Sequence, residues 1–85
     1  MTYSVRFDKS AEREIDRLSR KTWERVHRKL EQLTSNPRPP GCLKLTGIEN
    51  TWRVRVGDIR IVYEIDDAAR TVTVARVRDR KDAYR

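Results

Sequence analysis

Arginine is the residue type whose spacing in this chain points most directly to chemistry. Arg53, Arg55 and Arg60 flank the dipeptide Gly57-Asp58, and the residues on both sides alternate between apolar and polar. This pattern predicts a β-hairpin with a two-residue turn, in which Arg55 lies directly across from Arg60. Like charges in that arrangement destabilise a sheet. We therefore interpret the arginines as a surface that meets an anion.

The other face of the predicted hairpin is apolar and is expected to pack into the core. Trp52 lies on this face, so we interpret it as a core residue and not as a base-stacking one. The pairs predicted across this face are Val56 with Ile59, Val54 with Ile61, and Trp52 with Tyr63.

A sheet surface rich in arginine can bind several phosphates and stack on unpaired bases. It can also support cleavage of RNA through the RNA's own 2′-OH, which requires in-line geometry, cations and proton transfer but neither a metal nor a cofactor. Arginine stabilises the developing charge but transfers protons poorly, because its pKa is above about 12. Glu64 shares the predicted face and is either a general base or a counterion. For Asp79 and Asp82, local salt bridging or end-capping is the simpler reading.

A third strand from Thr71 to about Arg78 would add to this surface. The opposite register would turn Arg76 toward the core, where an unpaired guanidinium is costly. We therefore expect Arg76 to join the arginine surface, with Arg78 and Arg80 at the end of the strand. The expected register pairs Ile65 with Thr71, Val62 with Val74, and Arg60 with Arg76.

The elements that position these strands precede them in the chain. Residues 3–7 alternate as a strand, and Asp8 or Ser10 can cap a helix after it. A second helix, with Thr22 as a possible N-cap, carries an apolar stripe; the stripe consists of Trp23, Val26, Leu30 and Leu33. Prolines end this helix, and residues 43–45 form a short strand candidate. The order predicts one α+β domain over residues 1–85: an N-terminal strand, a two-helix hairpin and a 3–4-stranded antiparallel sheet packed on the helices.

The composition of the chain says less about its function than the placement of arginines on the predicted sheet does. The chain has 85 residues and a net charge of +7, which favours anionic partners. The excess is spread over both halves, so bulk charge does not locate a ligand. Asp66-Asp67 is more typical of a turn than of a metal site, and His27 and Cys42 are read as structural or bystander residues. The single cysteine and the lack of a long apolar run predict a cytoplasmic protein with no metal and no membrane contact.

Four segments together resemble the RelE-type toxins of bacterial and archaeal toxin–antitoxin modules, within the RelE/ParE superfamily. They are Leu43-Lys-Leu-Thr-Gly47, Trp52-Arg-Val-Arg-Val56, Ile59-Arg-Ile-Val-Tyr63 and Arg80-Lys-Asp-Ala-Tyr-Arg85. The resemblance implies a RelE-like fold and a ribosome-dependent endoribonuclease that cuts mRNA in the decoding site. It also implies a 2′,3′-cyclic phosphate product and inhibition by a cognate antitoxin.

The resemblance assigns roles by position. Arg53 and Arg55 fall where the family often has lysines that orient and charge-stabilise the reacting phosphate, and Arg60 falls on a phosphate-stabilising arginine. Arg80 matches a C-terminal arginine near the leaving group, and Tyr84 a tyrosine that stacks on or activates the nucleotide. The residues expected to bind RNA without catalysing are Lys44, Arg76, Arg78 and Lys81.

This chain departs from the family pattern in ways that bear on activity. Arg53 and Arg55 are poorer proton acceptors than lysines, and Asp79 stands where many members have a histidine. Two alternatives stay open: a ParE-type inhibitor of DNA gyrase, and an inactive relative that binds only RNA or antitoxin. The expected partners are an antitoxin with an acidic toxin-binding segment, the ribosome and mRNA, with DNA bound only through the antitoxin complex.

Overall fold

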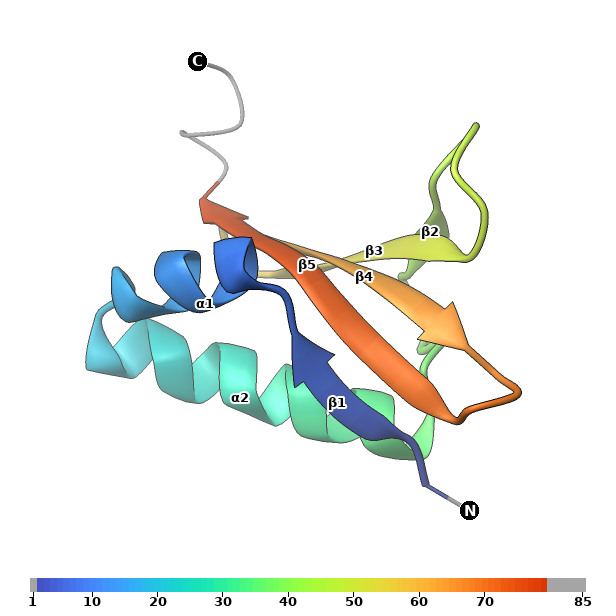
Figure 1. The fold of residues 1–85 in the computed structure, drawn as a ribbon. Coiled ribbons are helices and arrows are strands. Elements are labelled where there is room, and N and C mark those ends of the chain that lie inside the picture. The colour runs from blue at the N-terminus through green and yellow to red at the C-terminus, as the bar shows by residue number, and fades with distance from the viewer. Residues whose placement is uncertain (1, 80–85) are drawn as a thin grey trace.

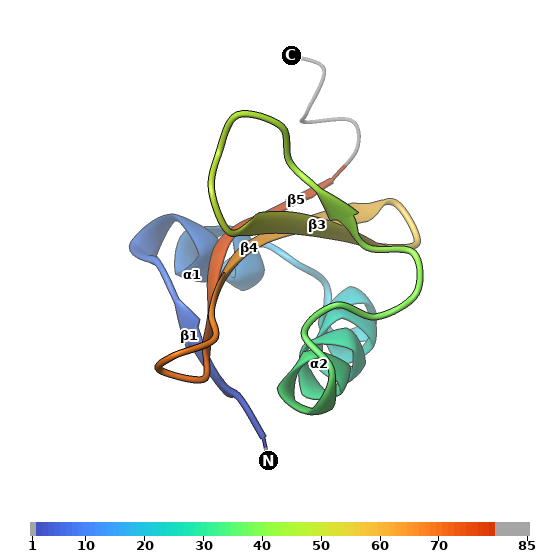
Figure 2. The ribbon, with the colours of Figure 1, turned by 90° about the vertical axis from the view of Figure 1, so that its right-hand side faces the viewer.

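A computed structural model describes residues 2–79 of the chain. Two helices lie on one face of a sheet, and the other face is left open (Figures 1 and 2). In chain order the elements are β1 (Ser4–Phe7), α1 (Lys9–Asp16), α2 (Arg20–Ser35), β2 (Leu43–Lys44), β3 (Thr51–Val56), β4 (Ile59–Asp66) and β5 (Thr71–Asp79).

The sheet has five strands in the order β1-β5-β4-β3-β2. Strands β2 to β5 are antiparallel, as predicted, but β1 joins the sheet parallel to β5. The α+β prediction is confirmed, with a mixed sheet in place of a wholly antiparallel one. No tight turn links β1 to β5, so local geometry does not force an antiparallel pairing, and β1 closes one edge of β5.

The second helix forms as its apolar stripe predicts, but its N-terminal cap differs. The cap is Ser19, whose hydroxyl accepts a hydrogen bond from the Thr22 N–H at 3.1 Å. The prediction of Thr22 as the N-cap was therefore wrong, because the cap lies three residues earlier and the helix begins at Arg20. Val26, Leu30 and Leu33 are buried, and Trp23 packs against the core.

The core lies between the helices and the apolar face of the β3–β4 hairpin, whose predicted register is confirmed at every pair. Gly57 opens the turn with a φ of 58°, a left-handed conformation that glycine adopts without strain. The residues that the core buries are Ala11, Val26, Leu30, Leu33, Val54, Ile59, Ile61, Tyr63, Ile65, Val72, Val74 and Val77.

The register predicted between β4 and β5 was wrong, and a β-bulge is the reason. The strands begin one residue away from the prediction, with Ile65 opposite Val72, a register that by itself would turn Arg76 to the core. Ala75 is then left without a cross-strand partner, and from Arg76 onward the side chains of β5 point to the opposite faces from those that strict alternation would give. After the bulge Arg76 opposes Val62 and Arg78 opposes Arg60, so both arginines leave the sheet on its open face.

A polar clamp holds the proline-rich loop after α2 against the turn between β4 and β5. Arg38 donates two hydrogen bonds to the Asp67 carboxylate, at 3.2 and 2.8 Å, and the Tyr3 hydroxyl donates a third at 2.5 Å. These bonds, first from Arg38 and then from Tyr3, lower the pKa of Asp67 to about 2. The Arg38 guanidinium also lies 5.2 Å from the ring centre of Trp52. Within residues 2–79, no helix is long and apolar enough to cross a membrane.

Candidate nucleic-acid interface

The open face of the sheet carries a row of three arginines, one on each of three neighbouring strands. Arg55 on β3 opposes Arg60 on β4, and Arg60 opposes Arg78 on β5. In the next row Arg53 and Arg76 lie on either side of Val62. We call these five arginines, residues 53, 55, 60, 76 and 78, the arginine face.

The hairpin half of this face carries positive charge that no carboxylate of residues 2–79 pairs with. In the part of the chain that the structure describes, Arg53, Arg55 and Arg60 form no ion pair within 4.0 Å. A shallow depression lies between Arg55 and Arg60 and is lined by the turn at Gly57 and Asp58. An oxyanion placed there would neutralise the repulsion that the pairing creates.

The β5 half of the face is organised by a residue that the sequence analysis did not select, Glu14 on α1. Its Oε2 lies 3.3 Å from Arg76 Nη2 and 3.3 Å from Arg78 Nε. Its Oε1 accepts a hydrogen bond from the Val77 N–H at 2.8 Å. In sequence Glu14 reads only as an acidic residue suited to a helix N-terminus. No local signal could link it to a strand 63 residues away.

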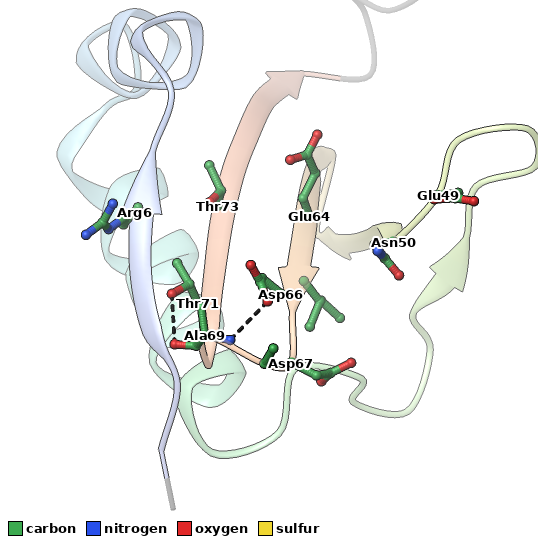
Figure 3. A pocket seen from close by; sticks show the side chains of 11 residues that line it. Arg6, Glu49, Asn50, Glu64, Asp66, Asp67, Ala69, Thr71 and Thr73 are labelled. Atoms are coloured by element: carbon green, nitrogen blue, oxygen red, sulfur yellow. Dashed lines mark hydrogen bonds between the residues drawn. The ribbon is translucent and has the colours of Figure 1, made fainter.

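The far end of the open face has the opposite chemical character. Glu64 on β4 lines a hollow together with Arg6 and other polar residues, and Figure 3 shows its carboxylate beside Thr73. No ion pair joins Glu64 to an arginine of the described chain. The arginine side chains of the open face are therefore concentrated at its hairpin end, and the carboxylates at its far end. The other polar side chains that line the hollow are Glu49, Asn50, Asp66, Asp67, Thr71 and Thr73.

The remaining predicted site residues do not all join the arginine face. Lys44 pairs with Trp52, so its side chain leaves the sheet on the opposite face from Arg53 and Arg55. Leu43, which pairs with Arg53, borders the arginine face instead and is 53% exposed. The other predicted positions lie outside the described residues: Arg80, Lys81, Asp82 and Tyr84.

Asp66 makes a local contact in the turn after β4, and His27 lies on the surface of α2. The Asp66 carboxylate accepts a hydrogen bond from the Ala69 N–H within its turn. Across residues 2–79, no group of three or more His, Cys, Asp or Glu side chains could hold a metal ion. His27 is half-exposed beside Trp23, with ring centres 5.4 Å apart and its Nδ1 3.4 Å from a Glu31 oxygen.

Relatives of the chain are toxins. The toxin RelG of Mycobacterium tuberculosis is 33% identical over 86 residues, which covers 100% of this chain and 99% of RelG. A protein of Escherichia coli described as a putative RelE-like toxin is 31% identical over 88 residues, 99% of this chain and 92% of the relative.

Solved structures agree with this relationship. The toxin–antitoxin complex RelBE2 of Mycobacterium tuberculosis contains a chain that matches with a TM-score of 0.81 and 29% identity, over 93% of this chain and 99% of that one. Residues 5–84 match the family model described as the ParE toxin of the type II toxin–antitoxin system parDE. The chain therefore belongs to the ParE toxin family of type II toxin–antitoxin systems, in the RelE/ParE superfamily.

Proposed function

We propose that this toxin is an endoribonuclease that cuts ribosome-bound mRNA in the decoding site. The observation that carries the proposal is the row of Arg55, Arg60 and Arg78 across three adjacent strands. Directly opposed like charges destabilise a sheet, and a bound phosphate would relieve their repulsion. The two relatives described as Rel toxins are consistent with this reading.

The arginine face suits the charge requirement of the reaction. The 2′-oxygen of a nucleotide attacks the adjacent phosphorus, the bond from phosphorus to the 5′-oxygen breaks, and a 2′,3′-cyclic phosphate and a 5′-hydroxyl result. Arg53, Arg55 and Arg60 would hold the phosphate and stabilise the negative charge that develops on its oxygens. The 2′-proton must leave and the 5′-oxygen must gain a proton, and arginine does neither efficiently. We assign the leaving-group and stacking roles to Arg80 and Tyr84.

We also propose that a cognate antitoxin with an acidic segment binds this domain and blocks its activity. The solved RelBE2 structure of Mycobacterium tuberculosis is a toxin–antitoxin complex. The net charge of +7 favours an acidic partner and raises the rate at which it associates.

Primer extension on a defined mRNA held on 70S ribosomes tests the nuclease proposal. The wild-type protein should cut at the decoding site only when ribosomes are present, and Arg60→Ala should abolish the cuts. Arg28→Ala is the matched control, because it removes the same charge from the exposed surface of α2, away from the arginine face. It should cut like the wild type.

Two results would count against this assignment. Full activity in Arg60→Ala, with circular dichroism showing a folded protein, would remove Arg60 from the site. If the folded wild-type protein makes no cuts at all, the nuclease proposal itself fails.

Inhibition of DNA gyrase is the second candidate function. The match to a family model described as ParE favours it, and so does the absence of a histidine at position 79. A gyrase supercoiling assay with the same preparations decides between the two. Inhibition of supercoiling together with intact mRNA would select this candidate.

A further inference from the structure

Glu14 lies beside the part of the β5 edge that no neighbouring strand of the described chain covers. Strand β1 covers the edge of β5 only as far as the pair of Phe7 and Val74. Beyond it, α1 packs along the edge of β5, and the Glu14 carboxylate accepts the hydrogen bond of the Val77 N–H that a neighbouring strand would otherwise accept. This hydrogen bond holds Oε1 in place and so orients Oε2 toward Arg76 and Arg78.

The second oxygen meets two members of the arginine face at once, since Oε2 is 3.3 Å from both Arg76 Nη2 and Arg78 Nε. The Glu14 side chain is only 17% exposed, whereas those of Arg76 and Arg78 keep 41% and 43% of their surface exposed. The backbone of β5 thus holds the Glu14 carboxylate in place, while the Arg76 and Arg78 side chains remain partly exposed to solvent.

The contact of Glu14 with Arg76 also has an energetic cost. The need to satisfy the Val77 N–H at the edge of β5 does not explain this cost. Arg76 Nε is buried and has no hydrogen-bond partner among residues 2–79, which is unfavourable for a charged group. An exposed arginine in a random orientation would avoid this cost. A function that requires Arg76 and Arg78 to keep one fixed orientation would explain why the fold bears this cost.

We propose that Glu14 is a positioning residue, which orients Arg76 and Arg78 so that their free guanidinium nitrogens meet the phosphates of an RNA bound on the arginine face. This inference rests on the proposed nuclease function. It assigns a role in that function to Glu14, which lies near the N-terminus on α1, whereas the arginine face lies on β3, β4 and β5.

The first test compares cleavage by Glu14→Gln and Glu12→Gln on ribosome-bound mRNA. Both variants remove one negative charge from α1. Glu12 is exposed and forms no ion pair with Arg76 or Arg78 in the described chain, and glutamine at position 14 keeps an oxygen for the Val77 N–H. Glu14→Gln should cut roughly ten- to a hundredfold more slowly at saturation, because its arginines are displaced. Its half-saturating concentration should not rise, because the net positive charge of the surface increases. Glu12→Gln should match the wild type in both.

The second test does not depend on cleavage. Nuclear magnetic resonance of the arginine Nε–H groups is recorded while a short single-stranded RNA, octauridylate, is added. In the wild-type protein the Arg78 Nε–H signal should be protected from exchange by the carboxylate and should shift on addition of RNA. The signal should disappear through exchange in Glu14→Gln and persist in Glu12→Gln.

Three results overturn the inference. One is equal cleavage rates for the two variants; another is a parallel loss of rate, affinity and melting temperature in Glu14→Gln, which marks a purely structural role. The third is a wild-type Arg78 signal that RNA does not move. If the wild type fails to cut mRNA while RNA still shifts a signal that depends on Glu14, the nuclease proposal fails and the positioning role stands.

Discussion

At the scale of single residues, the arginine pair is the most informative feature because it opposes the stability of the fold. Arg55 is exposed and Arg60 is half-buried, and the two lie directly across from each other. Cross-strand like charges cost up to about 1 kcal/mol. The proposed anion would remove this cost only while it is bound, so the proposed function and the stability of the free protein oppose each other at this position.

This conflict predicts that Arg55→Thr will stabilise the free protein. Threonine suits a strand and removes the repulsion, so the free energy of unfolding in urea should rise by about 0.2–1 kcal/mol. Arg53→Thr is the control, because Arg53 opposes Val62 and no arginine. An equal rise in both variants would show that strand propensity, and not repulsion, is responsible.

At the scale of elements, a single unpaired residue decides which side chains β5 presents. Val72 and Val74 point to the core before Ala75, and Val77 does so after it, while Arg76 and Arg78 point outward. Strand alternation without the bulge would place both arginines against the helices.

Deletion of Ala75 should therefore be tolerated. The shortened strand loses only its unpaired residue, so Val74 stays on the core face and Arg76 follows it on the open face. We expect a small change of melting temperature by circular dichroism. Deletion of the paired residue Thr73 should lower it much more, because either Val72 or Val74 then leaves the core face and a cavity remains. Equal losses in the two variants would refute this role of the bulge.

The clamp between the proline-rich loop and the β4–β5 turn predicts a specific dependence on pH. The pKa of Asp67 is lowered from 3.8 to about 2, first by Arg38 and then by Tyr3. A folded-state pKa below the unfolded one stabilises the protein above about pH 4, and this stabilisation is lost as the pH falls toward 2.

Asp67→Asn should thus lower the melting temperature at pH 7, and the difference from the wild type should shrink between pH 4 and pH 2. Thermal melts across this range check the prediction. Asp66→Asn is the control, since asparagine can still accept the hydrogen bond of the Ala69 N–H. A gap between Asp67→Asn and the wild type that stays constant with pH would exclude the carboxylate charge as its source.

At the scale of the whole molecule, the position of charge matters more than its amount. The net charge of +7 is spread over helices and strands, yet the open face divides into an arginine end and an acidic end. The RNA of the proposed function would therefore be attracted to the arginine end and repelled from the acidic end.

This division predicts unequal effects from equal changes of charge. The double variant Arg53→Gln, Arg55→Gln should reduce the slope of log affinity against log salt for single-stranded RNA by about 1.4, or about 0.7 per lost phosphate contact. The variant Lys21→Gln, Arg28→Gln removes the same charge from α2 and should leave the slope unchanged. Equal slopes for the two variants, measured by fluorescence anisotropy, would mean that binding follows bulk charge alone.

The sequence by itself determined the parts of this protein that depend on local periodicity. Strict alternation around Gly57-Asp58 specified the hairpin and the pairing of Arg55 with Arg60, and the apolar stripe specified α2. A period of two or of 3.6 residues assigns side chains to faces without reference to the rest of the chain.

Only the tertiary structure decided what depends on contacts between distant segments. The place of β1 beside β5, the bulge at Ala75 and the hold of Glu14 on Arg76 and Arg78 have no local signature. Each results from a balance over the whole fold, in which buried charges must be avoided and free backbone groups must find partners. The pairing of the hairpin arginines was therefore predictable, and the contact of Glu14 with Arg76 and Arg78 was not.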